Sequence, residues 1–287
     1  MSSNDAIRIL HVTDPHLHAD PATQLYGVRT DRSFRAVIER ALGDEQWQPD
    51  VVLATGDLVE DRSQKGYERF REIMRPCGLP ILCLPGNHDD PARMSQILNE
   101  DNFSFCATHD IGPWRVIMLN SHLPEDEGGQ LSGSELARLD AALAGSNEQH
   151  VLVCVHHQPI DMGSQWLDGY GLRNATALLS ILKRYPCAKG IVWGHVHQAS
   201  DRQHQNLRLL STPSTCAQFT PGTVTCVMDT RPPGFRRLNL AADGAISTDV
   251  LWLDDWIISS RPPDSRAKNG QIYSSWLMKN WIINPLC

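Results

Sequence analysis

Residues 81–89 read Ile-Leu-Cys-Leu-Pro-Gly-Asn-His-Asp: four apolar residues, then a turn that carries an amide, an imidazole and a carboxylate. So short an apolar run, ended by Pro-Gly, is typical of a buried strand. The arrangement recurs at 51–57, where Val-Val-Leu-Ala-Thr ends in Gly-Asp. A buried strand followed each time by a polar turn predicts an α/β sheet with functional groups at the carboxyl ends of its strands.

Similar apolar runs continue along the chain, at 7–12, 116–119, 151–155 and 190–193. Helical spacing of apolar residues separates them at 34–42, 136–143 and 174–183, the second preceded by a capping box of Ser132 and Glu135. From about residue 206, β-like runs follow at 207–210, 224–228, 235–240 and 250–253. We therefore expect an α/β fold of two packed mixed β-sheets flanked by helices. Residues 1–258 are predicted to form one domain, and 259–287 a C-terminal tail.

Composition narrows the class of protein. The 287 residues can bury a sizeable core, and a net charge of -7 disfavours binding to nucleic acid, which needs a clustered basic face. No apolar run approaches the roughly 20 residues of a transmembrane helix, and the start of the chain does not resemble an export signal. The eight cysteines include no Cys-x-x-Cys pair. We expect reduced thiols and a cytoplasmic location.

Carboxylate, amide and imidazole side chains follow five of the predicted strands. The candidate metal ligands are Asp14, His16, Asp57, Asn87, His156, His195 and His197. Oxygen and nitrogen ligands without a thiolate suit divalent Fe, Mn or Zn and disfavour a structural zinc site. Seven ligands are too many for one tetrahedral ion but suffice for two ions about 3.5–4 Å apart if a carboxylate bridges them. Each motif alone also fits an ordinary turn, so the indication of a metal site comes from their joint occurrence.

The order of these blocks, Asp-x-His, Gly-Asp, Gly-Asn-His-Asp, His and Gly-His-x-His, resembles the calcineurin-like metallophosphoesterases. Within them the likeness is greatest to the class III cyclic-nucleotide phosphodiesterases, the bacterial 3′,5′-cyclic AMP phosphodiesterases above all. It extends over roughly residues 7–253 and includes the strings YGVRTDRSFRAVI (26–38), GLRNA (171–175) and STPSTCAQF (211–219). The resemblance implies a four-layer sandwich and a hydrolase that converts 3′,5′-cyclic AMP to 5′-AMP, ending cyclic-nucleotide signalling.

Position by position, the resemblance implies two divalent ions bridged by Asp57. One would be held by Asp14, His16, Asp57 and His197, and the other by Asp57, Asn87, His156 and His195. It also implies that a hydroxide bridging the ions attacks phosphorus, while His88 contacts the phosphate and protonates the leaving oxygen. The substrate would border His16, Asp57, Asn87 and His88.

Several other residues keep two interpretations. His157 competes with His156 for the ligand role, although successive residues leaving a strand point to opposite sides; the resemblance selects His156. Arg173 and Asn174 are candidate nucleotide contacts or residues that shape loops. Trp166 is expected either to stack on a purine or to anchor its loop.

Other functions remain to be weighed against this one. A broader phosphodiesterase, acting on 2′,3′-cyclic nucleotides or other phosphodiesters, stays open. A protein phosphatase of the superfamily would carry Asp-Arg-Gly where Asp61-Arg62 is followed by Ser63. A nuclease would be expected to have a basic surface. A non-catalytic scaffold is disfavoured because none of the ligands has been lost. The tail contains Trp276 and Trp281, which we expect to contact the body, a second subunit of a homodimer or a membrane surface.

Overall fold

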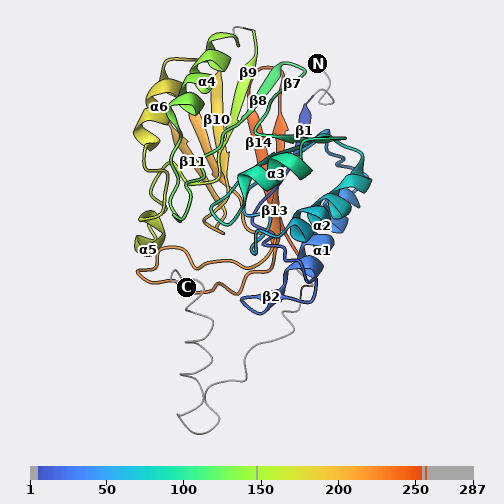
Figure 1. The fold of residues 1–287 in the computed structure, drawn as a ribbon. Coiled ribbons are helices and arrows are strands. Elements are labelled where there is room, and N and C mark those ends of the chain that lie inside the picture. The colour runs from blue at the N-terminus through green and yellow to red at the C-terminus, as the bar shows by residue number, and fades with distance from the viewer. Residues whose placement is uncertain (1–5, 147, 254–255, 257–287) are drawn as a thin grey trace.

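A computed structural model of the chain describes residues 6–146, 148–253 and 256. Two six-stranded β-sheets pack face to face, and helices cover the outer face of each sheet (Figure 1). The predicted α/β fold, with two mixed sheets between layers of helices, is confirmed. The predicted tail at 259–287, with its subunit and membrane contacts, lies outside the described residues, and the boundary at residue 258 stays a prediction.

The first sheet has the order β14-β13-β1-β4-β5-β6. Its four strands from β1 to β6 are parallel, and β13 and β14 complete it as an antiparallel pair. The strands are β1 (Ile7–Val12), β4 (Val51–Thr55), β5 (Ile81–Leu84), β6 (Phe103–Phe105), β13 (Gly234–Leu240) and β14 (Ile246–Trp252). Because β1, β4 and β5 are parallel neighbours, the turns that follow them lie at one end of the sheet.

The second sheet has the order β11-β12-β10-β9-β8-β7, with antiparallel strands at its two edges and parallel strands between them. The strands are β7 (Thr108–Ile111), β8 (Trp114–Met118), β9 (His150–Cys154), β10 (Ala188–Trp193), β11 (Ser200–His204) and β12 (Leu207–Ser211). A small hairpin of β2 (Gln24–Leu25) and β3 (Val28–Arg29) stands apart from both sheets.

Three apolar layers hold the sandwich together. The central layer fills the space between the sheets with side chains such as Ile9, Leu53 and Trp114. The first sheet is covered by α1 (Thr30–Leu42), α2 (Gln64–Met74), the 3₁₀ turn η1 (Arg75–Cys77) and α3 (Pro91–Ile97). The second is covered by α4 (Gly133–Ala144), α5 (Gln165–Asp168) and α6 (Ala175–Lys183). Strands buried on both faces explain the uninterrupted apolar runs in the sequence.

The sequence predictions of strands fail where an apolar segment is exposed or a polar segment forms a strand. The apolar run 224–228 is not a strand: only Met228 makes an isolated bridge, and Val224 is 69% exposed. The polar edge strand β11 was not predicted, because none of its side chains is buried. Six described cysteines are free thiols, whereas Cys226 is disulfide-bonded, so the expectation of a reduced thiol is wrong at that position. Among the described residues no helix is long and apolar enough to cross a bilayer.

Candidate metal centre

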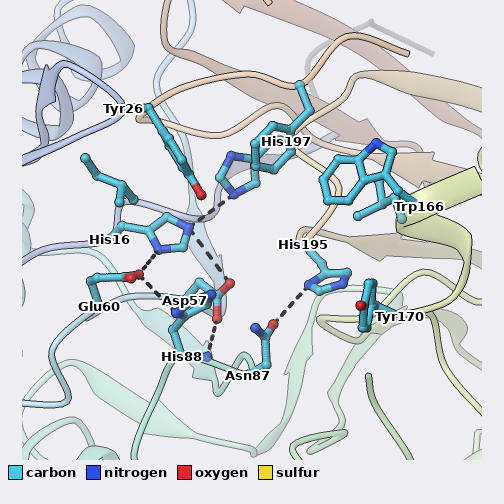
Figure 2. Close-up of a pocket in the computed structure, with 13 residues that line it drawn as sticks. His16, Tyr26, Asp57, Glu60, Asn87, His88, Trp166, Tyr170, His195 and His197 are labelled. Carbon is cyan, nitrogen blue, oxygen red and sulfur yellow. Dashed lines mark hydrogen bonds and ion pairs between the residues drawn. The ribbon is translucent and has the colours of Figure 1, made fainter. Parts of the chain in front are cut away.

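The turns that follow β1, β4, β5, β9 and β10 meet at one end of the sandwich, and all seven candidate ligands lie there. Figure 2 shows His16, Asp57, Asn87, His195 and His197 among them. A first group surrounds His197. Its Nε2 lies 3.1 Å from His16 Nε2 and 3.5 Å from Asp14 Oδ1. His16 Nε2 is 3.9 Å from Asp57 Oδ2, so Asp57 borders this group.

A second group lies on the other side of the same Asp57 carboxylate. His156 Nε2 is 3.2 Å from Asp57 Oδ2 and also 3.2 Å from Asn87 Oδ1. His195 Nδ1 lies 3.0 Å from Asn87 Oδ1. The two groups therefore share one carboxylate, and each offers four nitrogen or oxygen atoms within a few ångströms.

Hydrogen bonds behind the ligands determine which atoms face the cluster. His197 Nδ1 and His156 Nδ1 each lie 2.7 Å from a backbone carbonyl, of Ala217 and Thr55. An imidazole that donates from Nδ1 to a carbonyl presents the lone pair of Nε2 on its other side. Asn87 donates from Nδ2 to Glu127 at 2.5 Å, which turns its Oδ1 toward the cluster. Acceptor atoms thus face acceptor atoms, an arrangement that a cation would satisfy.

The electrostatics of the cluster also favour positive charge. Burial opposes ionisation of Asp57, but His156 and His88 outweigh it, and the pKa of Asp57 lies well below its usual range. Burial likewise lowers the pKa of His156, but Asp57 and then Asp14 outweigh it and raise that pKa to about 9. Buried carboxylates that stay ionised must be paired with positive charge, either a metal ion or a protonated imidazole. The donor set therefore fits divalent metal ions.

Backbone conformation at the site is unusual. Five of the candidate ligands have positive φ angles, between 47° and 65°: Asp14, His16, Asp57, His195 and His197. This left-handed region is uncommon for residues with a Cβ and persists only where surrounding contacts enforce it. Backbone bonds do so here, since the Asp14 amide donates to the Gly56 carbonyl at 3.1 Å and the His16 amide donates to the Asp57 carbonyl at 3.0 Å. Such strain is concentrated at functional sites.

Two glutamates, which the sequence analysis did not identify, hydrogen-bond to residues of the centre. Glu60 Oε2 lies 2.7 Å from His16 Nδ1 and 3.0 Å from His88 Nδ1. Burial lowers the pKa of His88, but Glu60 and Asp57 outweigh it and raise that pKa to about 10. Glu127 orients Asn87 and lies 3.9 Å from His88 Nε2. Neither glutamate follows an apolar run, so no strand-end pattern marked them.

Asp89 holds two turns of the site together. It is buried and accepts hydrogen bonds from the backbone amides of Leu58, Val59 and Gly86. The Tyr67 hydroxyl lies 3.0 Å from the same carboxylate. Asp89 therefore links the turn after β4 to the turn after β5, which fixes Asp57 against Asn87.

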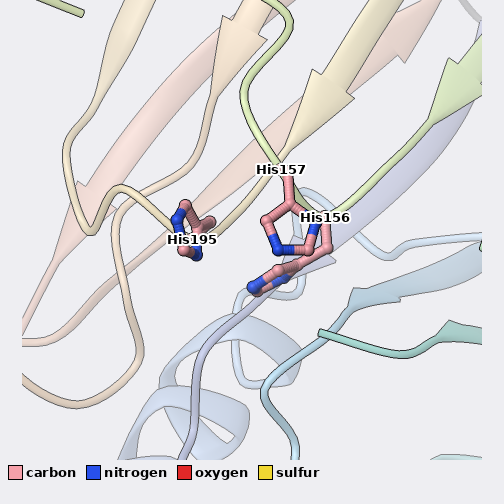
Figure 3. Close-up of side chains that lie close together, drawn as sticks. All are labelled: His156, His157 and His195. Carbon is pink, nitrogen blue, oxygen red and sulfur yellow. The ribbon is translucent and has the colours of Figure 1, made fainter. Parts of the chain in front are cut away.

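His157 lies closer to the cluster than the alternation of a strand would suggest (Figure 3). Its ring centroid is 4.9 Å from that of His156 and 4.8 Å from that of His195. The side chain is buried, with Nδ1 2.8 Å from the Ser121 hydroxyl. His157 thus packs behind two candidate ligands.

The candidate nucleotide contacts lie elsewhere. Arg173 pairs with Asp126 at 2.5 Å and has a half-exposed side chain. Asn174 exchanges hydrogen bonds with the backbone of Leu131 through its side-chain amide. Neither residue lines the pocket above the cluster. Their loop-shaping interpretation agrees better with this geometry.

The fold and the site together define a hydrolase-like α/β sandwich with a centre suited to two metal ions. A family model described as calcineurin-like phosphoesterase matches residues 7–199, about two thirds of the chain. The chain belongs to this family, as its sequence predicted.

Curated relatives match over most of their length. The 3′,5′-cyclic adenosine monophosphate phosphodiesterase CpdA of Pseudomonas aeruginosa is 38% identical over 254 residues, 88% of this chain and 93% of the relative. Its Escherichia coli K12 counterpart is 40% identical over 250 residues, with 87% and 90% covered. The 3′,5′-cyclic-nucleotide phosphodiesterase of Nostoc sp. is 36% identical over 252 residues, with 87% and 94% covered. These relatives confirm the prediction that the chain is an enzyme of the cyclic-nucleotide phosphodiesterase class.

A solved structure agrees on the fold. A dimetal phosphatase from Danio rerio superposes with a TM-score of 0.62 at 14% identity, covering 81% of this chain and 92% of the other. At this identity the likeness concerns the fold alone.

Proposed function

We propose that this chain hydrolyses 3′,5′-cyclic AMP to 5′-AMP at a pair of divalent metal ions. The observation that carries the proposal is the pair of ligand groups sharing Asp57, in which lone pairs of nitrogen and oxygen face one another. The substrate is suggested by the relatives from Pseudomonas aeruginosa and Escherichia coli, whose names state this activity.

The residues present fit two ions. Asp14, His16 and His197 with Asp57 form one set, and Asn87, His156 and His195 with Asp57 form the other. Nitrogen and oxygen donors of this kind accept iron, manganese or zinc. If bound there, such ions would supply Lewis acidity, which would lower the pKa of water at the site and offset charge on the phosphate oxygens.

The protein's own part in the chemistry centres on His88. Its Nδ1 lies 3.0 Å from Glu60 Oε2, a pairing that favours the protonated ring and leaves Nε2 toward the pocket. As the nucleophile's oxygen bonds to phosphorus, the bond from phosphorus to O3′ breaks. The proton on His88 Nε2 passes to O3′, which leaves as a hydroxyl of 5′-AMP. The His88 amide donates to Asp57 Oδ1 at 2.9 Å, so the acid and the shared ligand are fixed to each other.

Replacing His88 by Ala tests the acid role. We expect kcat for cyclic AMP to fall by about 10²–10⁴, because proton transfer in the transition state is lost, while metal content measured by elemental analysis stays unchanged. His204→Ala is the matched control, because His204 is exposed on β11, away from the pocket. If the His88→Ala enzyme turns over cyclic AMP at a rate close to wild type, His88 is not the general acid.

A panel of substrates tests the reaction itself. Metal-loaded protein should hydrolyse cyclic AMP with a higher kcat/KM than 2′,3′-cyclic AMP or bis(p-nitrophenyl) phosphate. A preference for either of the latter would favour the broader phosphodiesterase. A protein that binds two ions per chain and hydrolyses none of these diesters would instead be a scaffold.

A further inference from the structure

The side chains of Tyr26, Trp166, Tyr170 and Phe219 lie beside the candidate metal centre and form an aromatic wall. None of them is a candidate metal ligand. The pocket above the centre is open to solvent, holds about 450 Å³ of empty space that includes part of that solvent, and has these four side chains among its lining residues. Figure 2 shows Tyr26 on one side of the histidine cluster and Trp166 and Tyr170 on the other. A molecule whose phosphate lies on the centre would extend between these rings.

The rings are held in place before any ligand arrives. Phe219 stacks on His197 at a centroid distance of 4.6 Å and an interplanar angle of 20°. It contacts Tyr26 edge to face at 5.8 Å and Trp166 edge to face at 5.1 Å. The buried ring of Phe219 therefore contacts Tyr26, Trp166 and the candidate ligand His197. Preordered aromatic side chains bind planar groups without a further cost in side-chain entropy.

The position of Tyr26 depends on local backbone geometry. Tyr26 and Gly27 form the two-residue turn between β2 and β3, and both have positive φ angles, of 51° and 78°. That combination is the two-residue hairpin turn whose twist matches the strands beside it. The hairpin brings the ring over His16, and Figure 2 shows the phenol oxygen directed toward the cluster.

The chemistry of the wall identifies its occupant. Among the described residues that line the pocket there is no Arg or Lys, so a ligand carrying further phosphates would find no side-chain cation there. Away from the candidate ligands, Glu60 and His88, the lining is aromatic or aliphatic, and its polar atoms belong to two tyrosines and one indole. Such a surface suits an uncharged planar ring, and base stacking on aromatic side chains is tolerant of sequence because every base has a π-face.

We propose that Tyr26, Trp166, Tyr170 and Phe219 form a nucleobase subsite that selects cyclic nucleotides by stacking rather than by hydrogen bonds to the base edge. The inference rests on the proposed function, since it assigns the base of the same substrate. It has two consequences. A substrate without the base should have a much lower kcat/KM than cyclic AMP, and cyclic GMP should have a kcat/KM close to that of cyclic AMP.

The test compares cyclic AMP with the 3′,5′-cyclic phosphate of methyl riboside, which keeps the scissile diester and lacks the base. Both products are monoesters, so a phosphatase-coupled release of phosphate measures both. Trp166→Leu and Tyr170→Leu should lower kcat/KM for cyclic AMP by about 5- to 150-fold, the range of one lost stacking contact. The loss with the abasic substrate should be much smaller. Trp47→Leu is the control: Trp47 is a partly buried tryptophan that packs against α1 and β13, donates from Nε1 to Asn239 and does not line the pocket.

The expected ratio of kcat/KM for cyclic AMP to cyclic GMP is below about tenfold in wild type. A ratio above a hundredfold would overturn selection by stacking alone. Equal losses for cyclic AMP and the abasic diester in both pocket variants would overturn the subsite while leaving the hydrolase intact.

Binding separates this inference from the proposed function. Calorimetry of metal-loaded protein with 5′-AMP and with ribose 5-phosphate should show tighter binding of 5′-AMP, and Trp166→Leu should reduce the difference by about 5- to 150-fold. If wild type hydrolyses no cyclic nucleotide yet shows this base-dependent binding, the subsite stands and the proposed reaction fails. If neither hydrolysis nor base-dependent binding is found, both fail.

Discussion

Gly86 offers a direct test of how closely the turns of the metal centre pack. A Cβ at this position would lie 2.5 Å from the amide nitrogen of Asp57 and 2.7 Å from its Cγ, and closer still to Oδ1. Ordinary contacts between such atoms begin near 3.4 Å, so Gly86→Ala requires Asp57 to move by about 1 Å. One of these atoms is backbone, so rotation of the Asp57 side chain alone would not relieve the clash.

The movement falls on the carboxylate that both ligand groups share. A displacement of about 1 Å in a reacting centre can cost about 10² in rate. We therefore expect Gly86→Ala to lower kcat/KM for cyclic AMP at least a hundredfold and to reduce the metal retained after gel filtration. Gly133→Ala is the matched control, because a Cβ at Gly133 meets nothing within 4 Å at the start of α4. Circular dichroism should show that both variants stay folded. Activity of Gly86→Ala within threefold of wild type would refute the reasoning.

Further predictions concern the support of the centre and the core. Glu127→Ala should lower metal affinity about 10- to 100-fold, because the amide of Asn87 is then free to turn, whereas Glu127→Gln, which keeps an acceptor, should cost less. Titration with Mn²⁺ measures both. Chelation should abolish hydrolysis and lower Tm, with recovery on adding metal, because an ion bound only by the folded state stabilises it. His11 is buried, with its ring nitrogens 2.7 Å and 2.6 Å from the hydroxyls of Thr55 and Thr212. Burial, and then Arg236, lower its pKa from 6.5 to about 3. The unfolded chain therefore binds a proton that the folded chain does not. This residue's contribution to stability is complete above pH 6.5 and declines toward pH 3, by at most about 1.4 kcal/mol per pH unit. Urea unfolding of chelated protein at pH 7 and pH 5 should show that decline, and it should be smaller in His11→Gln.

The sequence was informative where one short segment carries both structure and chemistry. Asp57 follows a fully buried strand, as Asn87 does, and the strand and its turn can be recognised together in a few residues. Glu60 and Glu127 could not be found in this way. Each acts through a partner 44 or 40 residues distant, and nothing in the neighbouring sequence indicates that approach.

The same limit explains the errors in secondary structure. Hydrophobicity predicted a strand at 224–228, but no strand of the described part of the chain covers it, and Val224 is exposed there. Backbone pairing made β11 from the polar stretch Ser200–His204, because β12 offered it a free edge. Edge strands depend on their partner more than on their own side chains.

The seven candidate ligands come from both sheets, which the sequence motifs alone do not show. The first sheet supplies Asp14, His16, Asp57 and Asn87, whereas the second supplies the imidazoles of His156, His195 and His197. Each proposed ion therefore takes ligands from both sheets, and Asp57, on the first sheet, lies 3.2 Å from His156 of the second. Because binding free energy available only to the assembled site adds to folding free energy, the ions would strengthen the packing of one sheet on the other at this end. The five left-handed ligand residues are consistent with that arrangement: their strain is tolerable only where two layers hold the turns from both sides.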